Sequence, residues 1–242
     1  MAQLKKYLIT GGSGKLGVYL TKLLPCIAPS HEQLDILNPK QIYTWLKKQP
    51  YRGLIHLAAI SDQQQADKDR LNSYKINVIG TRNIAHVAVK YKLKVFYIST
   101  DYIFDGLTGN YQESDKPSPA NWYGFTKYAG ELEIQQVLKD FCIIRTSFRP
   151  IIWPFPTAFS NIYTSADYID IIAAEIALAI KLNTKGILHL GTRKKPMYQL
   201  AKKRNPQVKP EICQLKTLPK KRYFNLDHWL SIKYKHAKLK NL

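Results

Sequence analysis

Two side chains four residues apart, Tyr123 and Lys127 in NWYGFTKYAGE, have the types and the spacing needed to donate a proton to a carbonyl oxygen. Residues four apart lie on the same face of a helix, so both can face one substrate. A ketone that is being reduced becomes an alkoxide, which needs a proton at that moment, and an adjacent ammonium lowers the pKa of a tyrosine toward neutrality. We therefore expect Tyr123 to be a general acid supported by Lys127.

The position of this pair along the chain is more informative than its spacing, because Tyr-x-x-x-Lys occurs three more times in the sequence. Tyr123 follows the predicted strand KVFYIST, which ends in the polar residues Ser99, Thr100 and Asp101. In open α/β sheets, ligands bind at the carboxyl ends of the strands. We therefore expect Thr100 to hydrogen-bond the same carbonyl that Tyr123 protonates.

A glycine-rich stretch near the N-terminus, TGGSGKLG, predicts a nucleotide site. It is not a P-loop, because Ile9 and Leu16 stand where that motif needs Gly and Ser or Thr. It satisfies G-x-G-x-x-G and, through Gly11, Gly14 and Gly17, also G-x-x-G-x-x-G. A predicted strand precedes it and a predicted helix follows it, so backbone N–H groups there can face the pyrophosphate of a dinucleotide. Lys127 is then expected to hold the ribose of that cofactor.

The choice between NADH and NADPH stays open at this level. The ribose is normally recognised just after the second strand, and that strand is poorly defined in PCIAPSHEQLD. Glu32 has the chemistry to accept a hydrogen bond from a 2′-hydroxyl, whereas Ser30 and His31 would tolerate a 2′-phosphate. Asp35 is a candidate contact for the adenine, with an ordinary loop aspartate as the alternative.

The chain as a whole predicts an α/β fold. Short apolar runs alternate with amphipathic stretches as far as about Ser147, which is typical of a parallel sheet covered by helices on both faces. We expect a Rossmann-type doubly wound sheet over residues 1–146 and a small, basic, substrate-binding lobe over residues 147–242. A helix near residues 166–182 is expected to pack back onto the first domain.

Composition narrows the partners and the location. The formal net charge is +20, and residues 191–242 carry 15 Lys and Arg against Glu211 and Asp227, so an anionic substrate or, less favoured, nucleic acid is a candidate partner. The three cysteines match no metal-binding spacing, and we predict free thiols and no metal site. No apolar stretch reaches membrane-spanning length. We expect a cytoplasmic protein, and a homodimer stays open.

The motifs together resemble the extended short-chain dehydrogenase/reductase superfamily. The matching pieces occur in the expected order over roughly residues 4–150, namely TGGSGKLG, HLAA, NVIGTRN, STDYIFDG, YGFTK and IIRTS. Within the superfamily the chain is most similar to the dTDP-4-dehydrorhamnose reductase family. That resemblance implies NADPH- or NADH-dependent reduction of the 4-keto group of a nucleotide-linked 6-deoxysugar, with Thr100, Tyr123 and Lys127 as catalytic residues.

The same resemblance implies contacts for both ligands. The expected cofactor contacts, besides Tyr123 and Lys127, are Gly11, Gly14, Lys15, Leu16, Gly17, Asp35, Ile36, Ala58 and Ala59. The expected substrate contacts are Asp101, Tyr102, Phe148, Arg149 and Trp153. Related dehydratases have Asp-Glu after the catalytic Thr, where this chain has Asp-Tyr, so reduction is favoured over dehydration. The alternatives are a sugar-nucleotide epimerase and a non-catalytic regulatory or nucleic-acid-binding relative.

Overall fold

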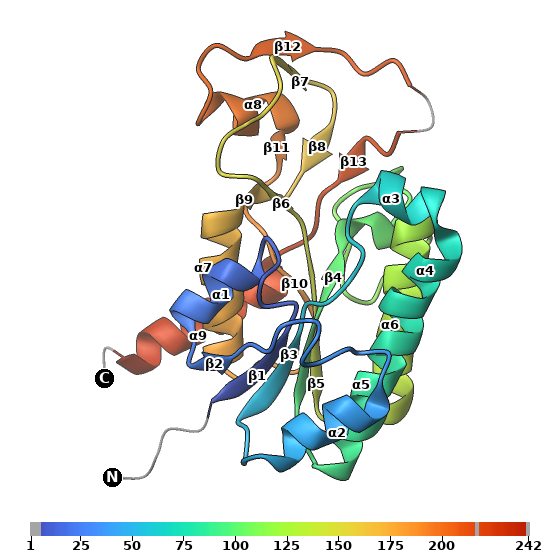
Figure 1. The fold of residues 1–242 in the computed structure, drawn as a ribbon. Coiled ribbons are helices and arrows are strands. Elements are labelled where there is room, and N and C mark those ends of the chain that lie inside the picture. The colour runs from blue at the N-terminus through green and yellow to red at the C-terminus, as the bar shows by residue number, and fades with distance from the viewer. Residues whose placement is uncertain (1–5, 216–217, 241–242) are drawn as a thin grey trace.

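The computed structural model describes residues 6–215 and 218–240, and its centre is a parallel sheet (Figure 1). The order of the six strands is β10-β5-β4-β3-β1-β2. These strands are β1 (Tyr7–Thr10), β2 (Cys26–Ile27), β3 (Gly53–His56), β4 (Val95–Thr100), β5 (Phe141–Thr146) and β10 (Gly186–His189). The chain leaves β1 toward β2 on one side and returns to β3 on the other. This reversal of direction is where open α/β sheets bind ligands.

Helices cover both faces of the sheet (Figure 1). One layer contains α2 (Pro39–Lys47), α5 (Thr81–Lys90) and α6 (Trp122–Val137), and the opposite layer contains α1 (Gly17–Leu23), α7 (Ile169–Lys181) and α9 (Asp227–Lys240). The side chains of β1 alternate between the two layers, since Leu8 packs in the core with α2, α5 and α6 while Ile9 packs in the core with α1, α7 and α9. A strand buried on both sides must be apolar at every position, which explains the unbroken run YLI.

Smaller helices pack beside α6, near the carboxyl end of the sheet (Figure 1). After β3 the chain forms α3 (Gln63–Lys68), α4 (Arg70–Tyr74) and a π-helical turn, η1 (Lys75–Gly80), which continues into α5. A 3-10 turn, η2 (Asp101–Ile103), follows β4 directly. The side chain of Asn121 caps α6 by accepting a hydrogen bond from the backbone N–H of Gly124 at 2.8 Å.

A small lobe rises above the carboxyl end of the sheet (Figure 1). It consists of β7 (Thr157–Phe159), β8 (Tyr163–Thr164), β11 (Lys195–Pro196), α8 (Met197–Lys202), β12 (Lys209–Glu211) and β13 (Lys221–Arg222). Two short strands, β6 (Phe148–Arg149) and β9 (Asp167–Tyr168), pair in parallel where the lobe meets the sheet. The lobe has its own small core, which includes Trp153, Ile162 and Met197.

The α/β fold and the order of its first strands and helices confirm the sequence prediction. The helix expected near residues 166–182 is α7, which packs against the sheet, and β10 and α9 return to the sheet as well. The reason is burial: Ile172 and Trp229 are fully buried in the core below β1, and the indole N–H of Trp229 donates to Glu175 of α7 at 2.6 Å. The lobe is therefore smaller than residues 147–242.

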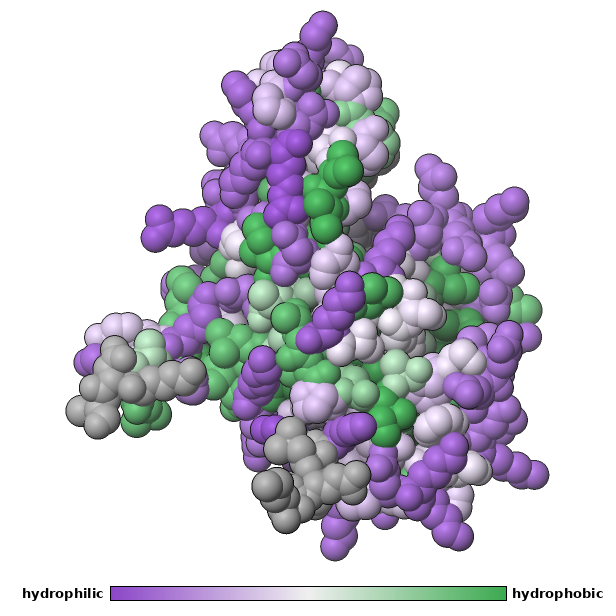
Figure 2. Space-filling view, turned by 60° about the vertical axis from the view of Figure 1, so that its left-hand side comes forward, coloured by the Kyte–Doolittle hydropathy of each residue, from purple (hydrophilic) through white to green (hydrophobic). Residues whose placement is uncertain are grey.

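The face formed by α1, α7 and α9 has hydrophobic residues gathered at its middle, below a largely hydrophilic lobe (Figure 2). Among the helices described, none is both long and apolar enough to cross a membrane. The cysteines Cys26, Cys142 and Cys213 carry free thiols. Within residues 6–215 and 218–240, no group of three or more His, Cys, Asp or Glu side chains is placed to hold a metal ion.

Candidate active site

A long cleft runs along the carboxyl ends of β1, β3, β4 and β5. It consists of two hollows of about 340 and 500 Å³, which share the backbone around Gly11, Ser13, Ala58 and Ala59. The smaller hollow lies over the loop after β2, and the larger one extends to the first turn of α6 and to β6. A cleft of this length suits an extended ligand with a second ligand beside one of its ends.

The glycine-rich turn forms the floor of the larger hollow, where Gly11, Gly14, Lys15, Leu16 and Gly17 all line it. Gly11 has a positive φ of 69°, and its carbonyl accepts the N–H of Gly14 at 3.0 Å. A Cβ on Gly17 would collide with the carbonyl oxygens of Gly11 and Gly12. The turn is therefore tight enough to bring backbone N–H groups and the start of α1 to one place, which is what a pyrophosphate needs.

The smaller hollow is lined by Pro29, His31, Leu34 and Ile36, so it offers an apolar slot with an imidazole at its side. Ile36 lies where the sequence predicted a cofactor contact, but Asp35 does not line the hollow. The Asp35 carboxylate instead accepts the backbone N–H of Leu37 at 2.8 Å and so stabilises its own turn.

The loop after β3 brings Ala58 and Ala59 into both hollows. Asn77 in η1 holds this loop, because its side-chain oxygen accepts the N–H of Ile60 at 2.8 Å and its amide donates to the Ile60 carbonyl at 3.0 Å and to the hydroxyl of Thr126 at 2.9 Å. One fully buried amide thus ties the loop to α6, on which the predicted catalytic tyrosine lies.

Thr100, Tyr123 and Lys127 come together in the larger hollow. Their proximity depends on Gly124, because a Cβ there would collide with the carbonyl of Tyr102 in η2. The close approach places the start of α6 against the end of β4, and the ring of Tyr102 meets the ring of Tyr123 edge-on, with centroids 6.2 Å apart. The Nζ of Lys127 lies 4.0 Å from the ring centroid of Tyr97 on β4.

The electrostatics of this group differ in part from the sequence expectation. Burial raises the pKa of Tyr123, and the hydroxyl of Thr100 opposes that rise only in part. Burial also lowers the pKa of Lys127 to about 7, against the carboxylate of Glu131, which raises it. Tyr123 therefore stays protonated through the neutral range, which is the form that can donate a proton, and the neighbouring amine titrates near neutrality.

The far end of the hollow is lined by Tyr102, Phe148 and Arg149. Behind them Arg222 of β13 lies 4.1 Å from the ring centroid of Tyr102, and its Nη1 is 3.6 Å from the carboxylate of Asp101. The Nε and Nη1 of Arg222 are buried and have no hydrogen-bond partner among the described residues. Burial, and then the nearby Arg222, lowers the pKa of Arg149. Two guanidinium groups thus share a site with one carboxylate, an arrangement that favours an anion.

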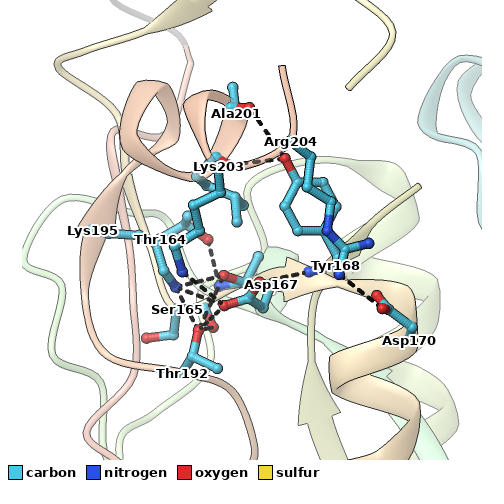
Figure 3. A network of polar contacts seen from close by, with 12 residues as sticks. Thr164, Ser165, Asp167, Tyr168, Asp170, Thr192, Lys195, Ala201, Lys203 and Arg204 are labelled. Atoms are coloured by element: carbon cyan, nitrogen blue, oxygen red, sulfur yellow. Dashed lines mark hydrogen bonds and ion pairs between the residues drawn. The ribbon is translucent and has the colours of Figure 1, made fainter. Parts of the chain in front are cut away.

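A polar network holds the strand pair that presents Phe148 and Arg149 (Figure 3). In β9, Asp167 pairs with Phe148 and Tyr168 pairs with Arg149. The Asp167 carboxylate accepts the hydroxyl of Thr192 at 2.8 Å and lies 3.4 Å from the Nζ of Lys195.

The second half of this network fixes Tyr168 (Figure 3). Its hydroxyl donates to the Leu200 carbonyl at 2.9 Å, and the guanidinium of Arg204 lies 4.1 Å from its ring centroid. Arg204 also donates to Asp170, at the start of α7, at 2.8 Å. The network therefore ties α8 and β11 of the lobe to the wall of the cleft.

Trp153 lies elsewhere. Its indole packs in the core of the lobe with 7% of its surface exposed, and its Nε1 donates to the Thr157 carbonyl at 3.1 Å. Asp101 is also buried behind the lining rather than in it. Of the five predicted substrate contacts, Tyr102, Phe148 and Arg149 thus line the cleft, and Asp101 and Trp153 do not.

Sequence reasoning missed several residues at the cleft. Ser61 and Gln63 line it, and the signal for them was weak, since they follow the HLAA segment in a run of polar residues. Asn77 lies in the NVIGTRN segment, but its type and position in the sequence do not indicate that it holds the loop after β3. Arg222 lies 121 residues after its partner Asp101, and nothing in the sequence marks it among the other basic residues of the tail.

Comparison with known proteins finds a matching family and several relatives. The family model described as RmlD substrate binding domain matches residues 5–149. The dTDP-4-dehydrorhamnose reductase of Aggregatibacter actinomycetemcomitans is 32% identical over 150 residues, which are 59% of this chain and 51% of that protein. The methionine adenosyltransferase 2 subunit beta of Xenopus laevis is 29% identical over 153 residues, which are 58% of this chain and 46% of that protein. The chain thus matches about half the length of these curated relatives.

A solved structure extends the likeness over nearly the whole chain. The crystal structure of dTDP-4-dehydrorhamnose reductase from Bacillus anthracis, in complex with NADP, superimposes with a TM-score of 0.84 at 28% identity, covering 96% of this chain and 93% of that one. The lobe therefore belongs to the shared architecture, although the family model ends at residue 149. The chain belongs to the RmlD substrate binding domain family.

Proposed function

We propose that this protein reduces the 4-keto group of a nucleotide-linked 6-deoxysugar, with NADPH or NADH as the reductant. The observation that carries the proposal is the convergence of Thr100, Tyr123 and Lys127 in one hollow that is continuous with the glycine-rich turn. The relatives named as dTDP-4-dehydrorhamnose reductases support the same reaction class.

The residues of the cleft fit a dinucleotide. Gly11 and Gly17 lack a Cβ where one would fill the turn, the neighbouring backbone can face a pyrophosphate, and the hollow lined by Pro29, Leu34 and Ile36 suits an adenine ring. Ala58 and Ala59 would pack beside the cofactor, and Lys127 would hold its nicotinamide ribose. When bound, a reduced nicotinamide supplies a hydride to the carbonyl carbon of the substrate.

The protein's part in the reaction is to orient the ketone and to supply a proton. The hydroxyl of Thr100, at the end of β4, would donate a hydrogen bond to the carbonyl oxygen and so set its direction. The phenol of Tyr123 is protonated at neutral pH and would transfer its proton to that oxygen as negative charge develops there. A charged Lys127 would then stabilise the phenolate, and bulk water would return the proton.

The cationic end of the cleft favours a substrate with a diphosphate. Arg149 lines the hollow, and Arg222 lies behind it with its Nη1 3.6 Å from the carboxylate of Asp101. A phosphate oxygen in the hollow would accept hydrogen bonds from Arg149 and relieve the repulsion between the two guanidinium groups. A free sugar ketone offers nothing to this end of the cleft, so we expect the nucleotide-linked form to be the substrate.

The direct test is to mix the protein with NADPH or NADH and a panel of 4-keto-6-deoxy nucleotide sugars while following the loss of absorbance of the reduced cofactor. Turnover with a nucleotide-linked ketone, and none with the free sugar ketone, is expected. Binding of reduced cofactor without turnover of any ketone in the panel would contradict the proposal and would favour a non-catalytic role, a possibility raised by the relative named as subunit beta.

Replacing Arg149 with methionine should weaken substrate binding selectively. The variant removes a cation from the cleft wall while keeping an unbranched apolar side chain. We expect KM for the nucleotide-linked ketone to rise roughly tenfold, the worth of one charge-assisted hydrogen bond. The affinity for NADPH, measured by fluorescence titration, should not change. Arg193→Met removes an exposed arginine of the lobe and is the matched control. An equal KM in both variants would place the diphosphate elsewhere.

A further inference from the structure

The glutamate one helical turn after Lys127 is completely buried, which is rare for a carboxylate and calls for a partner. That partner is Arg145 of β5, which is also buried. The Nε of Arg145 donates to Oε1 of Glu131 at 3.1 Å, and its Nη2 donates to Oε2 at 2.8 Å. Both carboxylate oxygens are therefore fixed by Arg145, and Glu131 lies four residues after Lys127 on the same face of α6.

Arg145 is itself held from two sides. Its Nη1 donates to the Glu113 carbonyl at 3.3 Å and lies 3.3 Å from Nε2 of His189 on β10. Burial and the charge of Arg145 lower the pKa of His189 to about 3, so the imidazole is neutral. Because its Nδ1 lies 2.9 Å from the Tyr111 carbonyl and must donate there, its Nε2 is free to accept from Arg145.

Lys127 has few other charged groups around it. Its Nζ rests on the ring of Tyr97 from β4. His56 of β3 is neutral, since burial and then Lys127 lower its pKa to about 3, and Tyr123 on α6 is a protonated phenol. Glu131 is the group that raises the pKa of Lys127 against burial. One anion thus offsets part of the loss of water around the amine.

We propose that Glu131 is a positioning residue, whose carboxylate, fixed by Arg145, extends the pH range over which Lys127 stays protonated beside Tyr123. The inference rests on the role given to Lys127 in the proposed function, but the protonation of Lys127 can be measured without any turnover. Removing the carboxylate would leave Arg145 as a second cation in the same interior, so the amine would give up its proton at a lower pH.

The experiment follows Lys127 itself. The protein is labelled with trace acetic anhydride across a range of pH, and acetylation of the Lys127 peptide is quantified by mass spectrometry, because only the neutral amine reacts. The variants are Glu131→Gln and the double variant Glu131→Gln/Arg145→Met, which replaces a buried ion pair by a neutral pair that still packs. Glu133→Gln, two residues along the same helix and partly exposed, is the control.

We expect the midpoint of Lys127 labelling to fall by about one pH unit or more in Glu131→Gln, to fall by less in the double variant, which also removes the Arg145 cation, and to stay unchanged in the control. The alkaline limb of ketone reduction should move in the same direction in the double variant. An unchanged labelling midpoint in a folded Glu131 variant would show that the pair serves the structure alone and would overturn the inference. Absence of ketone turnover in the unmodified protein would count against the proposed function but not against this inference.

Discussion

Replacing Tyr123 with phenylalanine should lower kcat for ketone reduction by about 10²- to 10⁴-fold, the usual contribution of a positioned general acid. The reason is local, because burial keeps the phenol of Tyr123 protonated and this phenol lies in the same hollow as Thr100 and Lys127. KM for the nucleotide sugar should change little, because the ring remains to pack against Tyr102. Stopped-flow or steady-state loss of NADPH absorbance measures the effect.

The matched control for this variant is Tyr128→Phe, which removes a hydroxyl from the same helix but outside the cleft lining. Its kcat should stay within about twofold of the unmodified protein, since it touches none of the reacting groups. NADPH titration by fluorescence should show that both variants still bind cofactor. Activity of Tyr123→Phe equal to that of the control would mean that another group supplies the proton.

Much of the fold and of the glycine-rich half of the cleft could be predicted from the sequence, because both depend on local patterns. The strand YLIT, the glycines after it and the helix that follows specify one another within seventeen residues. The strand KVFYIST and the pair Tyr123 and Lys127 were also predictable from local patterns. Thr100, at the end of that strand, lies in one hollow with the pair.

The end of the cleft beside the lobe was less predictable, because it depends on contacts between distant segments. The aromatic side chain of Trp153 could stack on a sugar, but it is buried in the core of the lobe. Only the tertiary packing distinguishes these two roles. Arg222 lies behind Tyr102 of the lining and belongs to a two-residue strand that no periodicity in the sequence predicts. The return of β10 and α9 to the sheet depends likewise on where Trp229 is buried.

Replacing Gly17 with alanine should strongly weaken the binding of NADPH. The added Cβ would meet the carbonyl oxygens of Gly11 and Gly12, and neither backbone group can move without opening the turn. Opening would rotate away the N–H groups that face a pyrophosphate, and overpacking of this kind costs about 1–3 kcal/mol. We therefore expect Kd for NADPH to rise about 10- to 100-fold, as measured by fluorescence titration or calorimetry.

The neighbouring variant Val18→Ala provides the control, because Val18 is 43% exposed on the outer side of α1 and removing two methyl groups there leaves the turn intact. It should bind NADPH as the unmodified protein does. A Gly17→Ala protein with unchanged Kd and unchanged Tm would show that the turn does not face the cofactor. A lower Tm with unchanged Kd would lead to the same conclusion, since a steric defect confined to packing would weaken the fold and spare the ligand. The prediction is supported only if the free energy of NADPH binding falls by more than the free energy of unfolding. Such a result would mean that the close packing of the turn is needed to bind the pyrophosphate.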